Sequence, residues 1–528
     1  MNMLNRGERE FIKYNKNIWA EKKGIKKEVI LIQGSSISGG PNYLFRTATI
    51  AKKLESIFNY KSVVVLNKEK CHAKKDFQLY HSYNINDYIY SKIFYKSIFR
   101  YIKAYFIALA LFKKVIKDNN LATLKYKGVL IGDFIYDDII KSYKGKKLNS
   151  EVRVTVEKII DDDFRFFFAT IDYFLIYQNI LEKNNVKYLV TTHTQFSEYG
   201  LLARLAYRRM VSVFETTDIS LVYSDANKQN IVYPSCHSTL REHIKDAVNN
   251  TTNKDILVND AIKELKLRHQ GKIQQYDVKL AYYDKKLYTK QDLKEVLNIK
   301  NNNPFVIVMC HIFADASLSG GDGMLFDDYY KWLHSTLEEA AKIKNINWIV
   351  KPHPASKQYK EDGIVKKEVE GKNYDNIFLS PEDFSTASII NTIDAIVTAR
   401  GTAGLEYSCF KIPTIMAGRA FYSEFGFTID SSSKSEYINN LKSVGNLSKL
   451  NDEQANKARL VYYYFNKFST LENDKILTIE LINKIRGTNG DRRDINRAYE
   501  ILKENLEKYG FEKWSHFKLI EEFVKDDI

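Results

Sequence analysis

Short apolar runs alternate with longer amphipathic stretches along most of this chain, and this alternation constrains the fold more than any other feature. From residue 28 the chain reads EVILIQ, the glycine-rich GSSISGGP, the helical pattern NYLFRTATIAKKLESIF and a second apolar run, KSVVVLN. Further along, EYGLLARLAYRR separates the apolar runs VKYLVTTHT and VSVFETT. Strand, helix and strand at this spacing are typical of a parallel sheet with crossover helices, so the sequence predicts an α/β fold.

The alternation starts again at residue 304, after a polar, lysine-rich region around 245 to 303. It runs through PFVIVMCHI, LFDDYYKWLHSTLEEAAKI, NWIVKP, NIFLSP, DAIVTAR, AGLEYSCF and IPTIMAG. A chain of 528 residues is also too long for one ordinary core. We therefore expect an N-terminal domain over residues 1–290, a C-terminal domain over 304–450, and helices over 451–528 that pack back on the domains.

Charge and cysteine content narrow the partners and the compartment. Eighty Lys and Arg against 65 Asp and Glu give a net charge of +15, which indicates an anionic partner. The basic residues are scattered and no zinc-finger, basic-zipper or RNP1 motif is present, so we expect no nucleic acid. The four cysteines form no CxxC pair, which fits a reducing cytoplasm.

One region interleaves aromatic and basic residues over a long helical pattern, at 84–118. Its uncharged core, AYFIALALF, is nine residues long, far short of the roughly 20 needed to span a bilayer. We favour a core helix of the first domain; the alternative is a helix that lies on an anionic membrane surface. The expected location is the cytoplasm, with peripheral contact at the inner face of the membrane.

The stretch INWIVKPHPAS, residues 346–356, ends an apolar strand on two prolines. Each proline holds the residue before it in extended geometry, which applies to Lys351 and His353. Residues two apart in an extended chain point the same way, so both side chains are aimed at one place beyond the carboxyl edge of a sheet. Open α/β sheets bind ligands at that edge. The alternative is a plain strand terminator with a surface histidine.

The second candidate is the strand-to-helix turn in TARGTAGLEYSCFKIP. Small residues let a ligand approach the backbone, and the N–H groups at a helix start favour a phosphate. The turn consists of Arg400, Gly401, Thr402, Ala403 and Gly404, with Thr402 as the expected N-cap. Glu406 stands one residue beyond the capping-box position and is therefore free to bind sugar hydroxyls such as a ribose. Its alternative role is to complement the helix dipole.

Two further sets of residues belong to the first domain. Asp133 in GVLIGDFIYDD, and His193 and Glu198 in HTQFSEYG, follow apolar runs, where a carboxylate is able to serve as general base for a hydroxyl. Each acid taken singly is more often a cap or solvated. The glycine-rich loop GSSISGGP fits neither the GxGxxG dinucleotide motif nor a P-loop. We therefore expect only a loop on the acceptor side whose backbone a substrate approaches closely. Its residues are Gly34, Ser35, Gly39 and Gly40, and His193 is expected on the same acceptor side.

The motifs HIFADAS, LFDDYYKWL, NWIVKPHP, TARGTAGLEYSCFKIPTIMAGRAFYSEFGFT and IGDFIYDD resemble those of bacterial capsule polysaccharide biosynthesis proteins. These are glycosyltransferases of the GT-B fold related to the Kdo transferases, and more distantly to polysialyltransferases and CDP-glycerol glycerophosphotransferases. The resemblance covers most of residues 28–430 and is densest over 304–430. It implies two Rossmann-like domains facing a central cleft, with C-terminal helices.

The resemblance also implies roles for residues. In such relatives an HP motif meets the donor phosphate, and the small-residue turn with its glutamate meets phosphate and ribose. On this chain the resemblance implicates Lys351, His353, Arg400, Gly401, Thr402 and Glu406, and the expected donor site adds His311, Ala403 and Gly404. The polysialyltransferase-like enzymes carry an acidic pair before a glycine, whereas this chain has Glu198, Tyr199 and Gly200, so Asp133 competes with Glu198 for the role of base. His353 is the further catalytic candidate.

The function implied is transfer of an acidic sugar such as Kdo from a CMP-activated donor to a glycan or glycolipid acceptor. The chemistry needs a base for the acceptor hydroxyl and a cation for the departing phosphate. Lys351, Arg400 and the helix start offset that charge, and CHIFADAS offers His311 and Asp315 without a tight ligand cluster, so we expect no metal and no cofactor beyond the nucleotide sugar. The alternatives are a UDP-sugar or CDP-glycerol donor, or a binding protein without turnover.

Overall fold

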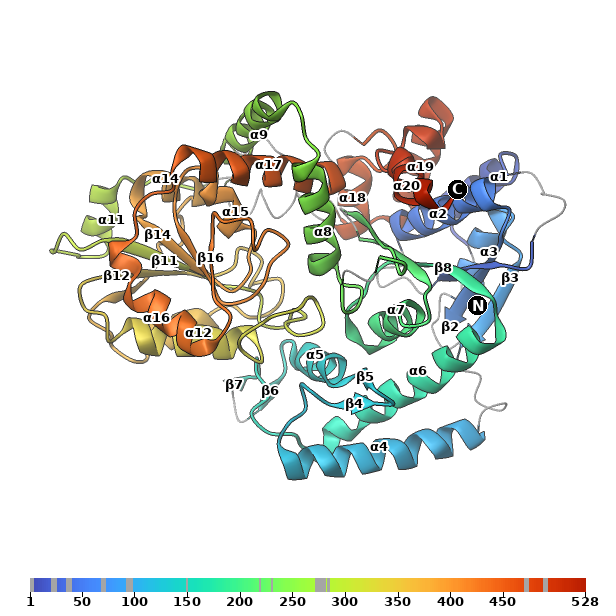
Figure 1. Ribbon diagram of the computed structural model, residues 1–528, viewed down its shortest axis with the longest axis horizontal. Helices are drawn as coiled ribbons and strands as arrows, with labels where there is room; N and C mark the ends of the chain where they lie inside the picture. The colour runs from blue at the N-terminus through green and yellow to red at the C-terminus, as the bar shows by residue number, and fades with distance from the viewer. Residues whose placement is uncertain are drawn as a thin grey trace. The chain divides into compact units, whose positions relative to one another are not determined.

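The computed structural model describes residues 4–528 except 20–25, 35–39, 68–72, 92–97, 149–150, 218–219, 229–230, 271–281, 283–284, 470–473 and 488–491. The chain divides into two compact units (Figure 1). Unit 1 comprises residues 1–135, 160–239 and 468–528, and unit 2 comprises 136–159 and 240–467. Three of the boundaries fall inside helices: α5 (Gly132–Tyr143), α8 (Cys236–Asn249) and α17 (Asp452–Ser469).

Unit 1 is built on a six-stranded sheet in the order β10-β9-β8-β1-β2-β3. Its strands are β1 (Val29–Gln33), β2 (Lys61–Asn67), β3 (Asp87–Ser91), β8 (Val186–Thr191), β9 (Ser212–Thr216) and β10 (Leu221–Ser224). All neighbours are parallel except β10, which runs antiparallel to β9. Strands β1 and β9 are buried along their whole length, as expected for a sheet covered on both faces. A two-stranded hairpin of β4 (Lys125–Tyr126) and β5 (Val129–Leu130) lies outside this sheet.

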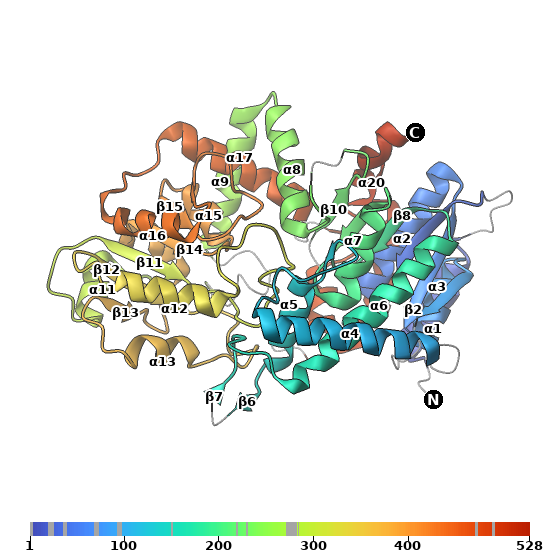
Figure 2. The same cartoon turned by 60° about the horizontal axis from the view of Figure 1, so that its bottom comes forward.

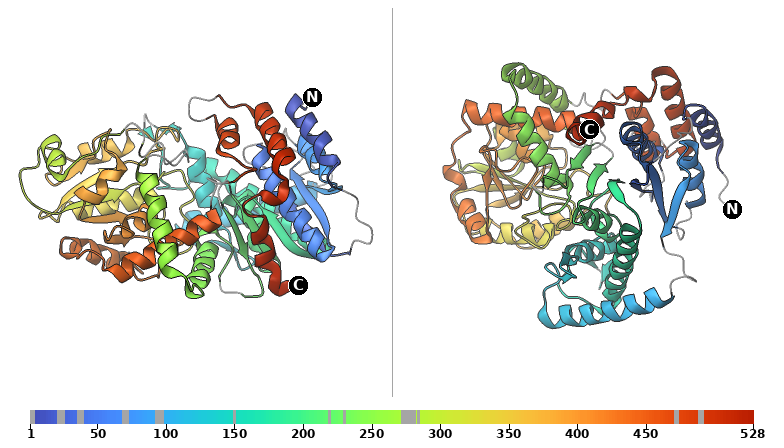
Figure 3. Two further views of the ribbon diagram at one scale, coloured as in Figure 1. Left: turned by 90° about the horizontal axis from the view of Figure 1, so that it is seen from above. Right: turned by 45° about the vertical axis from the view of Figure 1, so that its right-hand side comes forward.

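The helices of unit 1 come from both ends of the chain. They are α1 (Arg6–Lys16), α2 (Pro41–Phe58), α3 (Ala73–Ser82), α4 (Ile98–Asp118), α6 (Phe164–Lys183), α7 (Leu201–Tyr207), α18 (Ile479–Arg486), α19 (Ile495–Tyr509) and α20 (Phe517–Val524). Helix α19 packs on α1 and α2, and α20 packs on α2, so the C-terminal helices lie beside the N-terminal ones (Figure 3). One such contact joins the rings of Phe11 and Tyr499, with centroids 5.5 Å apart.

Unit 2 is built on a second six-stranded sheet, entirely parallel, in the order β13-β12-β11-β14-β15-β16. Its strands are β11 (Phe305–Met309), β12 (Asn347–Lys351), β13 (Ile377–Leu379), β14 (Ala395–Thr398), β15 (Thr414–Met416) and β16 (Ile429–Asp430). Because side chains alternate along a strand, Val306 and Val308 face one hydrophobic cluster and Ile307 faces the other. The hairpin of β6 (Lys147–Leu148) and β7 (Glu151–Val152) also belongs to this unit.

Helices cover both faces of the second sheet (Figure 2). One face packs α12 (Tyr329–Ala340), α13 (Ile364–Glu370) and α16 (Lys434–Lys442). The other face packs α11 (Lys290–Val296), α14 (Ile389–Thr392) and α15 (Ala403–Ser408). Helix α9 (Lys254–His269) also belongs to this unit.

The two predicted Rossmann-like sheets are confirmed, while the division of the chain differs from the boundaries expected at 290 and 450. Residues 240–290 group with unit 2, and 468–528 group with unit 1. The reason is tertiary: Arg241 and Arg268, both expected in the N-terminal domain, form ion pairs with Asp322 and Glu406 of unit 2. The central cleft stays a prediction.

Each sheet contains one topological switch point, where the strand order reverses. In unit 1 it lies between β1 and β8, and in unit 2 between β11 and β14. Connections on either side of such a point lead away from each other, which leaves a crevice at the carboxyl ends of the two strands. The two switch points are therefore the places to look for ligand sites.

Candidate active site

A pocket opens at the switch point of unit 2, at the carboxyl ends of β11, β12 and β14. It brings together most of the donor residues expected from the sequence. The predicted residues that line it are His311, Lys351, His353, Gly401, Thr402, Ala403 and Glu406. Arg400 and Gly404 are not part of the lining.

Lys351 is the last residue of β12 and is buried. Its Nζ donates a hydrogen bond to the carbonyl of Phe384, 3.0 Å away. Burial, and to a smaller extent the charge of Lys285, lowers the pKa of Lys351 to about 8. The ammonium therefore lies close to its titration point near neutral pH, and an anion in the pocket would favour its charged form.

His353 stands between Pro352 and Pro354, and all three residues line the pocket. The Ala355 backbone N–H donates to its Nδ1 at 3.1 Å. Because Nδ1 accepts this bond, a neutral ring carries its proton on Nε2. The structure thus places Lys351 and His353 in one pocket, with the imidazole orientation fixed from behind by the backbone.

His311 follows β11, and its ring stacks on Tyr329 with centroids 4.3 Å apart. Its Nε2 accepts a hydrogen bond from the Arg400 backbone N–H at 3.2 Å and lies 3.2 Å from the hydroxyl of Thr398. This imidazole therefore holds the end of β14, where the glycine turn begins.

The side chain of Arg400 is buried and already engaged with protein groups. Its Nε donates to the Tyr329 hydroxyl at 2.9 Å, and its Nη2 donates to the carbonyls of Ala316 and Ser317. The guanidinium fixes the loop after β11, and the phosphate contact expected for it stays a prediction.

The turn at 401–404 is tightly packed, which explains its two glycines. A Cβ on Gly401 would lie 3.1 Å from the Thr398 hydroxyl, and one on Gly404 would clash with the Tyr422 hydroxyl. Thr402 has helical φ and ψ and makes no side-chain cap bond, so the expected capping role is wrong. A side-chain cap requires extended backbone, whereas the helical turn begins before this residue.

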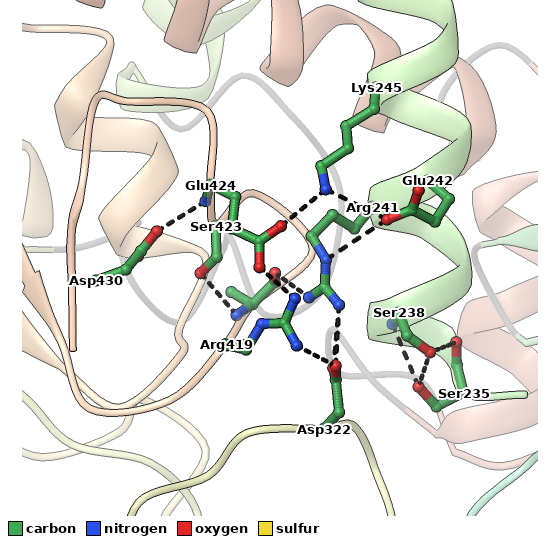
Figure 4. A network of polar contacts seen from close by, with 11 residues as sticks. Ser235, Ser238, Arg241, Glu242, Lys245, Asp322, Arg419, Ser423, Glu424 and Asp430 are labelled. Carbon is green, nitrogen blue, oxygen red and sulfur yellow. Dashed lines mark hydrogen bonds and ion pairs between the residues drawn. The ribbon is translucent and has the colours of Figure 1, made fainter. Parts of the chain in front are cut away.

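Tyr422 braces this turn from the following loop, donating its hydroxyl to the Gly401 carbonyl. The loop is itself anchored by a network of ion pairs (Figure 4). Arg419 contacts Asp322 at 2.7 Å and also Glu424.

Side chains of α8 join the network in Figure 4. Arg241 reaches Asp322 at 3.1 Å, and Lys245 reaches Glu424 at 2.8 Å. Helix α8 and the loops at 320 and 420 are thereby tied together within unit 2.

Glu406 is not free, contrary to the sequence-based expectation. Its carboxylate is buried, pairs with Arg268 of α9 at 3.1 Å and accepts a hydrogen bond from the Tyr282 hydroxyl at 3.4 Å. Burial alone would lower the pKa of Arg268, but the Glu406 carboxylate raises it above its ordinary value. Sequence reasoning missed Arg268 and Tyr282, which also line the pocket, because they lie in the polar, lysine-rich region that precedes the second sheet.

At the switch point of unit 1, Glu198 lies on a π-helical turn, η3 (Phe196–Gly200), after β8. The backbone carbonyl of Glu198 accepts hydrogen bonds from Gln33 Nε2 at 2.7 Å and from the Tyr177 hydroxyl at 2.6 Å. Phe196 has a φ of 60°, a left-handed conformation that is costly for a bulky residue. Such irregular turns concentrate at functional sites.

A second carboxylate, Glu215 of β9, supports the same loop and was missed from the sequence. It accepts hydrogen bonds from the Thr194 backbone N–H at 3.1 Å and the Thr194 hydroxyl at 2.9 Å. Burial raises the pKa of Glu215 to about 7. His193 lies in this loop, its ring 5.8 Å from that of Tyr43.

Asp133 lies in the first turn of α5, where both of its oxygens bind one guanidinium. Arg204 donates to them at 2.9 and 2.7 Å. The guanidinium is also sandwiched between the rings of Phe134 and Tyr233, each 4.0 Å away. Asp133 is therefore engaged in a buried ion pair, whereas Glu198 lies at the switch point.

The expected acceptor-side loop is described only at its ends. Gly34 and Gly40 line a small pocket of unit 1 with Asp76, Tyr80 and Thr192 among the other residues. Ser35 and Gly39 lie outside the described residues. Within the part of the chain that the structure describes, no group of three His, Cys, Asp or Glu side chains is placed to hold a metal ion. The expected independence from metal stays a prediction.

Comparison with known proteins gives one family match. Residues 227–465 match the family described as capsule polysaccharide biosynthesis protein. This segment contains every residue that lines the pocket of unit 2. The resemblance seen in the sequence motifs is thus confirmed over residues 227–465. No curated relative matches the sequence at a significant level.

Several solved structures are similar at low sequence identity. KpsC of Thermosulfurimonas dismutans, a beta Kdo 2,7 transferase, is 15% identical with a TM-score of 0.33, covering 62% of this chain and 89% of that one. A Methanocaldococcus jannaschii UDP-GlcNAc 2-epimerase is 12% identical with a TM-score of 0.26, covering 81% and 97%. A Rickettsia africae glycosyltransferase is 13% identical with a TM-score of 0.27, covering 91% and 99%. These values are too low to carry an activity from one protein to another.

Proposed function

We propose, from the match of residues 227–465 to capsule polysaccharide biosynthesis proteins, that this chain is a glycosyltransferase of surface polysaccharide synthesis. The observation that supports it most is the pocket of unit 2, which gathers Lys351, His311 and His353 beside the 401–404 turn. An ammonium and two imidazoles at the carboxyl edge of a parallel sheet suit the phosphate of a nucleotide sugar.

The proposed donor is a CMP-activated acidic sugar such as Kdo, and the proposed acceptor is a glycan or a lipid-linked glycan at the inner face of the membrane. Such a donor carries a phosphate and a carboxylate, which agrees with the Lys351 ammonium in the pocket and with the net charge of +15. A UDP-sugar and CDP-glycerol are the alternatives, because the pocket residues recognise phosphate rather than a particular base.

In the proposed reaction Glu198 takes the proton from an acceptor hydroxyl. The acceptor oxygen then bonds to the anomeric carbon, while the bond from that carbon to the phosphate oxygen breaks and CMP leaves with the electron pair. Nε2–H of His353 and the Lys351 ammonium stabilise the charge that grows on the phosphate. We assign the base to Glu198 because both oxygens of Asp133 bind Arg204.

A nucleotide screen tests the proposal. The melting temperature of the full chain is measured with CMP, CDP, UDP and GDP, because a ligand at a hundredfold excess over its Kd stabilises by about 2.7 kcal/mol. We expect the largest rise with CMP, and a smaller one in Lys351→Met. A larger rise in melting temperature with UDP or CDP would indicate a UDP-sugar or CDP-glycerol donor instead. No rise with any nucleotide would contradict the proposed function.

Turnover is the second part of the test. The protein is incubated with CMP-Kdo and a lipid-linked glycan acceptor, and released CMP is measured. Nucleotide binding without acceptor-dependent release would favour a binding protein without turnover.

A further inference from the structure

The outer side of α4 carries side chains that are unusual for a helix at a protein surface. The helix packs on α6, with Ala104, Ala108 and Phe112 buried. On the opposite side Phe99 is 85% exposed and Phe106 is 64% exposed. Figures 1 and 3 show α4 at the edge of unit 1, with α6 beside it. The favoured interpretation of this region as a core helix is therefore right for one side of α4 only.

The exposed apolar residues are concentrated on this helix. Among the residues that the structure describes, 15 large hydrophobic side chains are exposed, and six of them lie on α4. The six are Ile98, Phe99, Ile102, Tyr105, Phe106 and Ile116. Single exposed apolar residues need no explanation, but a contiguous patch marks an interaction surface.

Lysines share this side of the helix. Successive side chains of an α-helix are about 100° apart around its axis, so one stripe of side chains runs along α4 on the side opposite α6. We call this stripe the outer face. The outer face consists of Phe99, Ile102, Lys103, Phe106, Lys113 and Lys117, with Lys114 at its margin. All four lysines are exposed, and the one acidic residue of α4 is Asp118, its last residue. The face is therefore both apolar and cationic.

This combination fits one kind of partner, an anionic lipid surface. Helices that lie in the membrane interface carry aromatic or aliphatic residues beside lysines, which reach the lipid phosphates. A second copy of the chain would instead bring two sets of lysines together. None of the described helices is long and apolar enough to cross a membrane, so α4 would lie flat on the bilayer.

We propose that the outer face of α4 docks the protein on an anionic bilayer, with Phe99 and Phe106 entering the headgroup boundary and the lysines contacting lipid phosphates. The docking itself does not depend on catalysis. Only its purpose, which is to bring the enzyme to a lipid-linked acceptor, rests on the proposed function.

Sedimentation of the full chain with vesicles tests the docking. We expect binding to vesicles that contain phosphatidylglycerol and little binding to pure phosphatidylcholine. Replacing both aromatics, Phe99→Ser with Phe106→Ser, should weaken binding about tenfold for each ring removed from the interface. Replacing Lys113 and Lys117 by Gln should weaken it about fivefold per lysine at low salt, and much less at high salt.

The matched control is a double variant that removes two exposed apolar residues elsewhere, Ile256→Ser with Val296→Ser; vesicle binding should not change. Light scattering and melting temperature are measured for every variant, to show that each stays folded. Unchanged vesicle binding by the double aromatic variant would overturn the proposal. So would a wild-type dimer that this variant converts to a monomer, because the face would then bind a second copy.

The nucleotide screen separates this proposal from the proposed function. Loss of vesicle binding with an unchanged response to CMP supports docking as a separate property of α4. Vesicle binding by a protein that responds to no nucleotide would leave the docking standing and contradict the transferase.

Discussion

The two sheets share a strand order, apart from the antiparallel direction of β10 in the first, but their carboxyl edges carry opposite chemistry. In unit 2 the switch point gathers Lys351, His311 and His353. In unit 1 the corresponding place carries the carboxylates of Glu198 and Glu215. The same strand arrangement therefore carries a cationic edge in unit 2 and an acidic edge in unit 1, and we propose that the first serves a phosphate and the second a hydroxyl. Topology decides where a site forms, and the side chains decide its role.

The two edges also differ in their backbone. No residue between 398 and 408 has a positive φ, and the turn of unit 2 is held by packing of Tyr422 and His311. In unit 1, Phe196 is left-handed and begins a π-helical turn. A strained residue costs about 1–3 kcal/mol and persists only where its surroundings enforce it. The acidic edge is thus the one that stores strain.

The largest effect is expected at the acidic edge. Glu198→Gln keeps the shape of the side chain but removes the base, so transfer should fall about 100- to 10,000-fold. CMP should stabilise the variant as it does the wild type, because the pocket is in unit 2. The control is Glu182→Gln, an exposed acid of α6, which should keep full activity. Activity of Glu198→Gln within a few-fold of wild type would move the base to another residue, with Asp133 the first to test.

The next effect is expected at the cationic edge. His353→Ala should slow transfer about 100- to 1,000-fold at saturating donor, because the phosphate charge grows as the sugar bond breaks. Pro354→Ala should give a milder defect, since it loosens the backbone of His353 and keeps the imidazole. His334→Ala removes a half-exposed imidazole of the same unit and serves as control. If nucleotide affinity fell as much as the rate, His353 would be a binding residue only.

A smaller effect, on stability, is expected from the pair that holds the pocket wall. Glu406→Ala leaves the Arg268 guanidinium without its carboxylate, and the free energy of unfolding in urea should fall by about 1.5–3 kcal/mol. Arg268→Met and the double variant complete a double-mutant cycle, in which a coupling energy near zero would contradict the pair. If Glu406→Ala kept its stability and bound nucleotide more weakly, Glu406 would be a ribose-binding residue instead.

The smallest effect is a pH dependence. Because burial lowers the pKa of Lys351 to about 8, the ammonium is present below that pH and lost above it. A bound phosphate raises this pKa, so nucleotide affinity should fall as pH rises through 8 and beyond. For each unit by which bound nucleotide raises the pKa of Lys351, nucleotide affinity at high pH should be about tenfold lower than at low pH.

Titration calorimetry between pH 7 and 10 measures this dependence. Lys351→Met should bind more weakly with a flat profile, and Lys351→Arg should keep its charge and show no fall. A wild-type profile that stays flat through pH 8 would mean that the Lys351 ammonium does not contact the phosphate.

The sequence predicted the strands well, because their signal is local. EVILIQ and PFVIVMCHI became β1 and β11, each at the switch point of its sheet. The pocket residues His311, Lys351 and Gly401 were found because each lies at or just beyond the end of an apolar strand. Arg268 could not be found in this way, because its helix precedes the sheet it serves and carries no motif.

By itself, the sequence determined the two α/β sheets and the extended geometry at Lys351, because apolar periodicity and the steric effect of proline act within a few residues. Only the tertiary structure decided that Glu406 pairs with Arg268 and that Asp133 pairs with Arg204. It also decided that one side of α4 stays exposed. These outcomes depend on which helix packs against which sheet, and the ends of an ion pair far apart in sequence are brought together only by that packing.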